Sequence, residues 1–419
     1  MLLQNKFKYV TLYLLLSCVN ICPAETRLHD FMPASTYYPE GSGARARGMA
    51  GAFMVIADDS TAGYWNPACL HNLQNKEFAI VTDYFHRIED NKFLEQPESD
   101  GIQSVSHFSL NHVSIAWPFY GKLFYGLPDA HHVISFNYQK QYDFTQKWNM
   151  QRQIQTATDH IDYQSEGKLS TIGIAYSLLI RENLFLGLMF NIWNNDLTQN
   201  HWKQTTYQEC IQGNKQLEKA LSTHTHIFNG YNANIGMLMT NIFNTAGLYK
   251  VNLGLVLKTP LTAEISELET FIHSKTGRQQ TQIETSITMP VTYGIGAALV
   301  SNDFNCELDI YHTRWNDSFF KAKPATTARI GAEYLFKQNT YLIPFRCGLA
   351  YESSPAENTT DLFWKLSLGT GIEFIDYYAI DFAYQFRFAD NVGESILAPM
   401  KFSQNIREHE MYSSIIFYF

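Results

Sequence analysis

The sequence predicts an all-β fold: a transmembrane antiparallel β-barrel of about fourteen strands, with an N-terminal hatch, or plug, in its lumen. Three observations predict this fold. Apolar and polar residues alternate along most of the 419-residue chain. Short and long connections alternate between the strands. A glycine-rich segment without strand periodicity precedes the first of them.

The alternation is clearest near the end of the chain. Every second residue there is aromatic or aliphatic: Tyr378, Ile380, Phe382, Tyr384, Phe386 and Phe388. The residues between them are mostly small, polar or charged. An apolar face toward lipid and a polar face toward a lumen produce this pattern. The chain ends on Phe419, and a terminal Phe after an alternating strand resembles the signature that outer-membrane assembly machinery recognises.

The same parity assigns the residues that line the lumen. An Arg or Lys that faces lipid at the bilayer midplane costs roughly 2–4 kcal/mol, so charged residues in the strands are expected to point inward. The lumen-lining candidates are Arg329, Glu333, Arg346, Glu352, Lys365, Glu373, Asp381 and Arg387. In an earlier strand, Asn137, Gln139 and Asp143 are expected to face inward, and Phe136 and Phe144 to face lipid.

Strand boundaries follow from the pattern and from turn residues. The predicted strands are 76–88, 105–118, 131–147, 163–180, 184–198, 222–241, 248–272, 279–300, 304–316, 326–337, 342–354, 362–374, 377–388 and 408–419. Tight turns are expected at 181–183, 301–303, 338–341 and 375–376. The longer connections are 89–104, 148–162, 199–221, 317–325, 355–361 and 389–407, and residues 213–222 could form a short helix. Short turns fit the periplasmic side and long loops the extracellular side.

The N-terminus has the features of a signal peptide, predicted for residues 1–24. Lys6 and Lys8 precede an apolar stretch that is too short to span a bilayer, and Cys22-Pro23-Ala24 resembles a cleavage site. Residues 25–75 are then the predicted hatch, and 76–419 the barrel. No apolar run long enough for a transmembrane helix follows. The expected location is the outer membrane of a Gram-negative-type bacterium, as an integral multi-pass barrel in contact with outer-membrane lipids.

Composition and motifs argue against several other functions. The formal net charge is −9, and loss of residues 1–24 removes two lysines, so nucleic-acid binding is not expected. His131-His132 and the pair His224 and His226 suggest metal ligands, but no third ligand can be nominated from the sequence. No serine-hydrolase elbow, Walker A or zinc-protease motif is present. We therefore predict no enzymatic activity, no metal site and no cofactor.

Residues 43–70 read GARARGMAGAFMVIADDSTAGYWNPACL and do not resemble a strand. Their glycines permit close packing or positive φ. Asp59 or Ser60 can cap a short helical turn that ends near Trp65, and Pro67 ends it because the residue before a proline avoids the α region. Asp58 and Asp59 are interpreted as capping or wall contacts rather than as catalytic carboxylates. Because a barrel of this size has room for a plug, the segment is a candidate plug.

This segment resembles the N-terminal block of the FadL/TodX-type outer-membrane transporters of hydrophobic compounds. The resemblance rests on G-A-R-x-x-G-M-x-G-A-F, A-D-D and W-N-P-A, and extends to the segments 308–315, 329–334 and 345–355. It implies a fourteen-stranded barrel whose hatch gates a path for a hydrophobic ligand. The positions that match the hatch motif are Gly48, Gly51, Asn66, Pro67 and Ala68. The family's third strand is kinked, whereas 131–147 contains no Gly or Pro.

The leading hypothesis is an outer-membrane channel for passive uptake of hydrophobic, fatty-acid-like small molecules, gated by the hatch. One alternative is a structural or secretion-associated barrel without small-molecule cargo. Another is a general diffusion porin. The porin predicts a water-filled lumen, whereas the transporter predicts a closed pocket with apolar lining.

Overall fold

The computed structural model describes residues 41–122, 130–154, 156–245, 249–317, 322–355, 361–394 and 401–419. The predicted signal peptide and the first part of the predicted hatch lie outside these ranges. Among the described residues, no helix is both long and apolar enough to cross a membrane.

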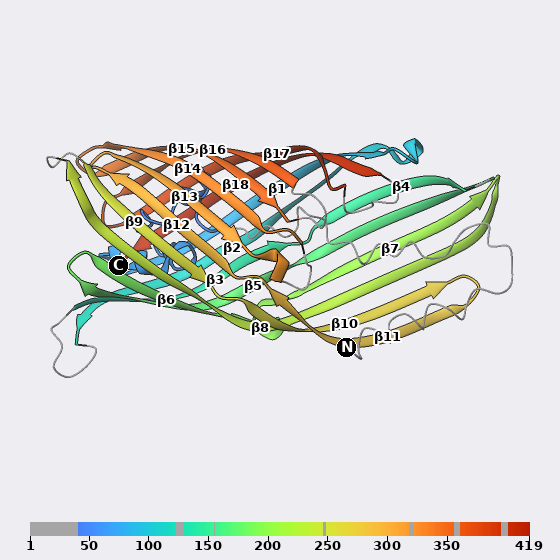
Figure 1. Ribbon diagram of the computed structural model, residues 1–419, viewed down its shortest axis with the longest axis horizontal. Helices are drawn as coiled ribbons and strands as arrows, with labels where there is room; N and C mark the ends of the chain where they lie inside the picture. The colour runs from blue at the N-terminus through green and yellow to red at the C-terminus, as the bar shows by residue number, and fades with distance from the viewer. Residues whose placement is uncertain are drawn as a thin grey trace.

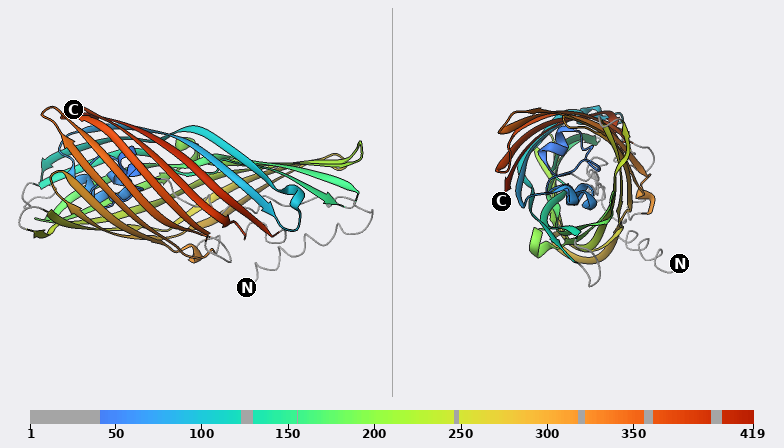
Figure 2. Two further views of the ribbon diagram at one scale, coloured as in Figure 1. Left: turned by 90° about the horizontal axis from the view of Figure 1, so that it is seen from above. Right: turned by 90° about the vertical axis from the view of Figure 1, so that its left-hand side faces the viewer.

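The described chain forms one closed antiparallel β-barrel, shown along and across its axis in Figures 1 and 2. The strands are β1 (Glu77–Phe93), β2 (Gly101–Gly121), β3 (Ala130–Asp143), β4 (Gln146–Ile154), β5 (Ala157–Arg181), β6 (Leu184–Trp193), β7 (His201–Gln212), β8 (Lys215–Thr245), β9 (Tyr249–Lys258), β10 (Leu261–His273), β11 (Gly277–Met289), β12 (Thr292–Val300), β13 (Phe304–Thr313), β14 (Ala325–Lys337), β15 (Tyr341–Ser354), β16 (Asp361–Phe374), β17 (Tyr378–Val392) and β18 (Phe402–Tyr418). The first and last strands pair along their whole length, from Glu77 with Tyr418 to Phe93 with Phe402, and this pairing closes the barrel.

The prediction of about fourteen strands is confirmed, because four of the barrel strands are each divided in two. The divided strands are β3 with β4, β6 with β7, β9 with β10, and β11 with β12. The interruption in the fifth barrel strand is the short helix α3 (Asn195–Thr198). Beyond these breaks, β4, β5, β7, β8, β10 and β11 continue as an extended sheet at one end of the molecule, on the right in Figure 1. We call this the hairpin end and the opposite end, with its tight connections, the turn end.

Two of these breaks face each other in neighbouring strands. Lys258 pairs with Thr292 and Leu261 pairs with Met289, so Thr259-Pro260 lies opposite Pro290-Val291. Proline has no N–H to donate to the ladder. The Thr259 amide instead donates to the Ala233 carbonyl at 2.8 Å. Pro260 and Pro290, which lie opposite each other, therefore interrupt the ladder between these two barrel strands.

The outer and inner faces of the barrel wall carry different kinds of side chain, as the alternation predicts. Large apolar side chains on the outside are half-exposed or exposed, as in Ile330, Tyr334, Phe345, Leu366 and Phe382. Glu333, Lys365 and Gln385, which alternate with them, are buried inside the barrel. An apolar outer band on a closed antiparallel barrel is the architecture of outer-membrane proteins.

Three local predictions are wrong. Much of the predicted connections 89–104, 148–162 and 199–221 is strand, because the hairpins continue well past the barrel rim. Residues 213–222 are not helical: Gly213 adopts φ +60° in the turn and β8 begins at Lys215. Phe144 is buried rather than lipid-facing, because a β-bulge between Lys140 and Tyr142 inserts one residue and reverses the parity.

Candidate functional site

Residues 41–75, which we call the inner segment, lie inside the barrel at the turn end, as the end-on view in Figure 2 shows. Their elements are α1 (Ala44–Gly48), α2 (Ala62–Trp65) and the 3-10 helix η3 (Pro67–Asn72). Gly43 and Gly51 have φ values of +88° and +80°, which explains glycine at both positions. The Asp59 carboxylate accepts the Thr61 amide at 2.8 Å just before α2. Thr61 is the N-cap residue of α2 and no side chain caps the helix, so the prediction that Asp59 or Ser60 caps this turn is wrong.

Asn66 connects the two halves of the inner segment to the wall. It is extended, at φ −154°, and separates α2 from η3. Its side-chain amide donates to the Met54 carbonyl at 3.0 Å and to the Met237 carbonyl of β8 at 3.2 Å, while its oxygen accepts the Ala68 amide at 3.1 Å. The Ala68 carbonyl accepts the Ser177 hydroxyl of β5 at 3.0 Å. The Asn-Pro-Ala tripeptide is therefore bonded to two wall strands.

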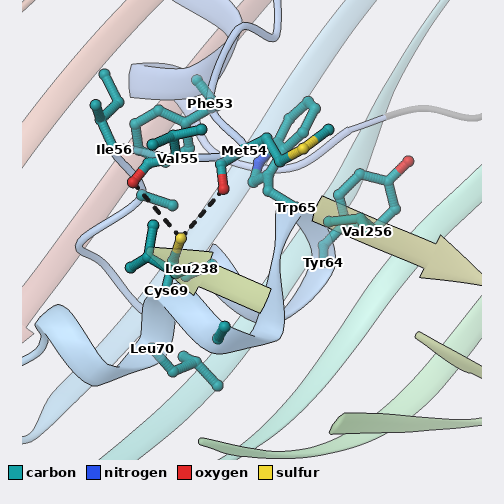
Figure 3. Close-up of a cluster of buried hydrophobic side chains, with 14 of the residues drawn as sticks. Phe53, Met54, Val55, Ile56, Tyr64, Trp65, Cys69, Leu70, Leu238 and Val256 are labelled. Carbon is teal, nitrogen blue, oxygen red and sulfur yellow. Dashed lines mark hydrogen bonds between the residues drawn. The ribbon is translucent and has the colours of Figure 1, made fainter. Parts of the chain in front are cut away.

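Apolar side chains fill the space between the segment's two halves and the wall, as Figure 3 shows. Phe53, Met54 and Val55 pack there with Trp65 and Cys69, all at most 2% exposed. The Cys69 thiol lies 3.1 Å from the Met54 carbonyl oxygen. This cluster gives the inner segment a small hydrophobic core, which extends onto Leu238 and Val256 of the wall.

Wall glycines let the backbone of the inner segment approach the wall closely. A Cβ atom on Gly187 of β6 would lie 2.1 Å from the Ala68 nitrogen, and one on Gly236 of β8 would lie 2.0 Å from the Asn66 side-chain oxygen. On the opposite side, Gly348 would meet Met49, and the Cβ of Gly369 would lie 2.9 Å from the Gly48 Cα. The absence of side chains at these glycines leaves the space on several strands into which the backbone of the inner segment packs.

Charged residues hold α1 against β14 to β18. The Arg45 guanidinium binds Glu333 at 2.8 and 2.9 Å and also pairs with Asp58. Arg346 binds Glu333 at 2.6 Å and also pairs with Asp381. Arg47 binds Glu410 at 2.6 Å. Removing one member of such a buried network leaves the other charges without a partner, which typically lowers the stability of the fold by about 3–5 kcal/mol.

The other lumen-lining candidates are distributed differently. Arg329 donates to the Gly51 carbonyl at 3.2 Å. Glu352 forms an ion pair with Lys365 at 2.8 Å and accepts a hydrogen bond from Arg387 at 2.7 Å, in a separate cluster nearer the hairpin end. Glu373 is half-buried near the turn end. The structure thus brings Glu333, Arg346 and Asp381 together, and leaves Glu352, Lys365 and Arg387 in a second group.

Two acidic residues of β13 were missed by the sequence analysis. Asp309 accepts the amides of Phe53 and Met54 at 3.0 and 3.2 Å, and Glu307 accepts those of Val55 and Ile56 at 2.6 and 3.1 Å. Their parity against outward-facing Leu308 and Ile310 could have placed both inside. Four successive amides that no helix or sheet satisfies are bonded in this way.

A cavity of about 100 Å³ lies next to the inner segment, bounded on that side by Tyr64 and Trp65. Its wall includes Trp193, Leu261, Met289 and Trp315 together with polar residues of β8, β9 and β14. The volume is far below the roughly 300–1,000 Å³ of typical ligand pockets, so a ligand larger than a small ring has to displace part of the lining. Thr259 and Pro290 bring the proline break to the cavity wall.

Two cations face this cavity. The Lys258 ammonium lies 3.8 Å from the centre of the Tyr64 ring, and the Arg329 guanidinium carbon lies 4.7 Å from that of Tyr311. Of the described residues that line the cavity, none is Asp or Glu. The hydroxyl of Tyr311 and the side-chain oxygen of Asn191 are buried there without a hydrogen-bond partner among the described residues.

The histidine pairs do not form a metal site in the part of the chain that the structure describes. His131 contacts His71 of the inner segment, with their Nδ1 atoms 3.3 Å apart. His132 accepts from, or donates to, the Tyr176 hydroxyl at 2.7 Å. His224 and His226 lie on the extended sheet, far along β8 from the inner segment's contacts at Gly236 and Met237.

No protein-family model and no curated protein matches the chain. Several solved structures, in contrast, are similar to the chain. The toluene transporter TodX from Pseudomonas putida superposes with a TM-score of 0.58 and 14% sequence identity, over 92% of this chain and 100% of that one. The chain has the fold of the FadL/TodX-type channels.

Two further structures agree with this fold. A FadL homologue from Pseudomonas aeruginosa gives a TM-score of 0.60 at 11% identity, over 92% of this chain and 99% of that one. The monoaromatic hydrocarbon channel CymD gives 0.52 at 13% identity, over 90% and 98%. The resemblance stated from the sequence is thereby confirmed at the level of the FadL/TodX-type fold. The third barrel strand carries its irregularity as the bulge at Gln141, which needs neither Gly nor Pro.

Proposed function

We propose that this protein is an outer-membrane channel for passive uptake of hydrophobic small molecules of the fatty-acid type. The fold supports this, because the similar structures are described as a toluene transporter, a FadL homologue and a monoaromatic hydrocarbon channel. The partly apolar cavity beside the inner segment supports it more specifically, since an open porin needs no such enclosed space.

The observation that carries the proposal is the chemistry of the cavity. Aromatic and aliphatic side chains offer an apolar surface, and the cationic groups of Lys258 and Arg329 also line the cavity. A hydrophobic acid satisfies both features, because its carboxylate meets the cations and its tail meets Trp193, Leu261 and Met289. The Tyr311 hydroxyl supplies a further donor for the head group.

In this proposal the inner segment is the described part of a hatch at residues 25–75. Tyr64 and Trp65 belong to both the segment and the cavity, so a ligand that enlarges the cavity pushes on the segment. Gly48, Gly51, Asn66, Pro67 and Ala68 are the proposed gating residues, since they form its closest wall contacts and its central turn. Hatch displacement then opens a path toward the turn end. Arg329 and Glu333 would hold the resting position.

Lys258→Gln tests the head-group proposal. The substitution keeps a polar side chain but removes the charge, and a hydrogen bond to a charged group is worth roughly 1.5–3 kcal/mol. We expect binding of a medium-chain fatty acid to the purified protein to weaken by about 10- to 100-fold. Binding of the corresponding methyl ester should change little.

Lys337→Gln is the matched control, because Lys337 pairs with Asp303 on the exposed turn side, away from the cavity. Equal loss of acid and ester binding in Lys258→Gln would point to damaged packing instead. If Lys258→Gln binds the acid as well as the wild type does, this cavity is not the binding site of the acid. High conductance of hydrophilic solutes through the intact protein would favour a porin, and absence of any ligand binding a structural or secretion-associated barrel.

Replacing Asn66 and Pro67 together by Ala tests the role of the turn. The variant loses three hydrogen bonds of Asn66, worth about 1 kcal/mol each, and the fixed φ of Pro67. We expect uptake of a labelled fatty acid by cells to fall, while the amount of heat-modifiable barrel on gels stays at the wild-type level. Asn316→Ala, on an exposed connection, serves as control. Wild-type uptake by the double variant would assign the tripeptide a purely structural role.

A further inference from the structure

Three side chains on the extended sheet form a continuous hydrogen-bond chain. Ser222 and His224 lie two residues apart on β8, and Glu267 lies on the neighbouring strand β10. The Ser222 Oγ is 2.9 Å from the His224 Nε2, and the His224 Nδ1 is 2.9 Å from the Glu267 Oε1. Residues two apart on a strand share a face, and Glu267 is the diagonal cross-strand neighbour of His224, so the sheet itself sets this geometry.

The carboxylate determines the protonation of the imidazole. Ionised Glu267 can only accept, so Nδ1 carries the proton that it donates. Nε2 of neutral His224 is then an acceptor, and the Ser222 hydroxyl donates to it. A hydroxyl, a base and an orienting carboxylate in this order are the parts of an activated serine nucleophile. Glu269 lies 4.0 Å from Nε2.

The surroundings of this chain suit an ester. Ser222 is half-exposed, whereas His224 is 2% exposed, so the nucleophile is accessible and the base is held in place. Phe271 lies directly opposite Ser222 on β10 and is partly exposed, so an aromatic ring adjoins the nucleophile. Trp202, Phe228 and Ile265 are buried further along the sheet, in one cluster with Leu261 and Met289 of the cavity wall. Thr206 lies directly opposite Ser222 on β7, where its hydroxyl can donate to a developing oxyanion.

We propose that Ser222, His224 and Glu267 hydrolyse esters of hydrophobic carboxylic acids at the hairpin end. The Ser222 oxygen bonds to the ester carbonyl carbon while Nε2 takes the hydroxyl proton. The bond to the alcohol oxygen breaks, and that oxygen leaves with the proton from Nε2. Water, deprotonated by Nε2, then attacks the acyl-serine carbonyl carbon. The bond from that carbon to the Ser222 oxygen breaks, the oxygen takes the proton back from Nε2, and the acid is released. Ester and water thus give acid and alcohol, with no other reactant.

This activity departs from the expectation that the chain has no enzymatic function, and it stands independently of uptake. Its link to transport rests on the proposed function: the released acid has the charge and apolar tail for which the cavity offers Lys258 and Arg329. The apolar cluster reaches from the extended sheet to the cavity.

The experiment uses the full-length protein in detergent micelles, with a fluorophosphonate probe and p-nitrophenyl octanoate as substrate. We expect the probe to label Ser222, as located by mass spectrometry, and Ser222→Ala to abolish labelling and lower ester hydrolysis by about 100-fold or more. Glu267 is a positioning residue, so Glu267→Gln should lower kcat while KM stays unchanged. Ser266→Ala is the matched control, because Ser266 donates to Glu284 at 2.7 Å but has no histidine partner.

Unlabelled wild-type protein that is heat-modifiable, and hence folded, would overturn the proposal. So would hydrolysis by Ser222→Ala at the wild-type rate. The two proposals remain separable: Ser222→Ala should still take up free fatty acid, and Lys258→Gln should still hydrolyse the ester. If Lys258→Gln loses only acid uptake, the proposed hydrolysis is unaffected. If Ser222→Ala loses hydrolysis but keeps uptake, the proposed channel function is unaffected.

Discussion

Deletion of residues 43–70 is expected to convert a nearly non-conducting barrel into one that conducts ions and small hydrophilic solutes. The closure between β1 and β18 and the other wall ladders are backbone pairings that do not involve the inner segment, so the barrel should still assemble. The segment's removal exposes Glu307 and Asp309, whose backbone partners it supplies, and takes Arg45 away from Glu333. Water that enters the lumen solvates these carboxylates. Single-channel conductance in planar bilayers measures the effect.

The intact protein is the reference in the same bilayers and should conduct little. An assembled deletion variant that stays closed would mean that the hairpin end blocks the channel. The β7–β8 hairpin and the apolar cluster around Trp202 and Phe228 would then be the obstruction. In that case the inner segment would have a structural role only. Selectivity for cations is expected in the open form, since Glu307 and Asp309 then face the lumen without the amides that they bind in the intact protein.

Gly187→Val is expected to displace the Asn-Pro-Ala tripeptide without changing any charge. The new Cβ would lie 2.1 Å from backbone atoms of both Pro67 and Ala68, where neither side can yield by rotating a side chain. Overpacking of a well-packed interior costs about 1–3 kcal/mol, and a backbone clash belongs at the upper end of that range. A cost of about 3 kcal/mol raises the displaced fraction of the segment by roughly 100-fold. Protease cleavage within residues 41–75 and channel conductance should both increase.

Gly121→Ala is the matched control, because a Cβ there has no atom within 4 Å. The control should behave as the wild type in cleavage and conductance. Gly187→Val should still give a heat-modifiable barrel, since Val is a good strand residue. If it shows wild-type conductance and protease resistance, close backbone contact at Gly187 does not hold the segment in place.

The alternation of the strands by itself determined the barrel, its approximate strand number and the inward side of most charged residues. This prediction is possible because a charged side chain in lipid is so costly that only one of the two faces of a regular strand can point outward. The turn chemistry of residues 59–67 was also local, since Asp59 and Pro67 act on their immediate neighbours. The resemblance carried by the W-N-P-A block indicated the same fold.

Only the tertiary structure decided where regularity fails and which distant residues meet. The bulge at Gln141 reversed the parity of Phe144, and hairpins continued through predicted loops because their strands pair with each other rather than with the barrel. The position of the inner segment depends on glycines and acidic residues from strands far apart in sequence. Likewise, Lys258 on β9 and Arg329 on β14 line one cavity although two strands lie between them in the wall. Glu267 meets His224 because the register of the neighbouring strands β8 and β10 brings them together. Such contacts arise from chain closure, and no local sequence pattern records them.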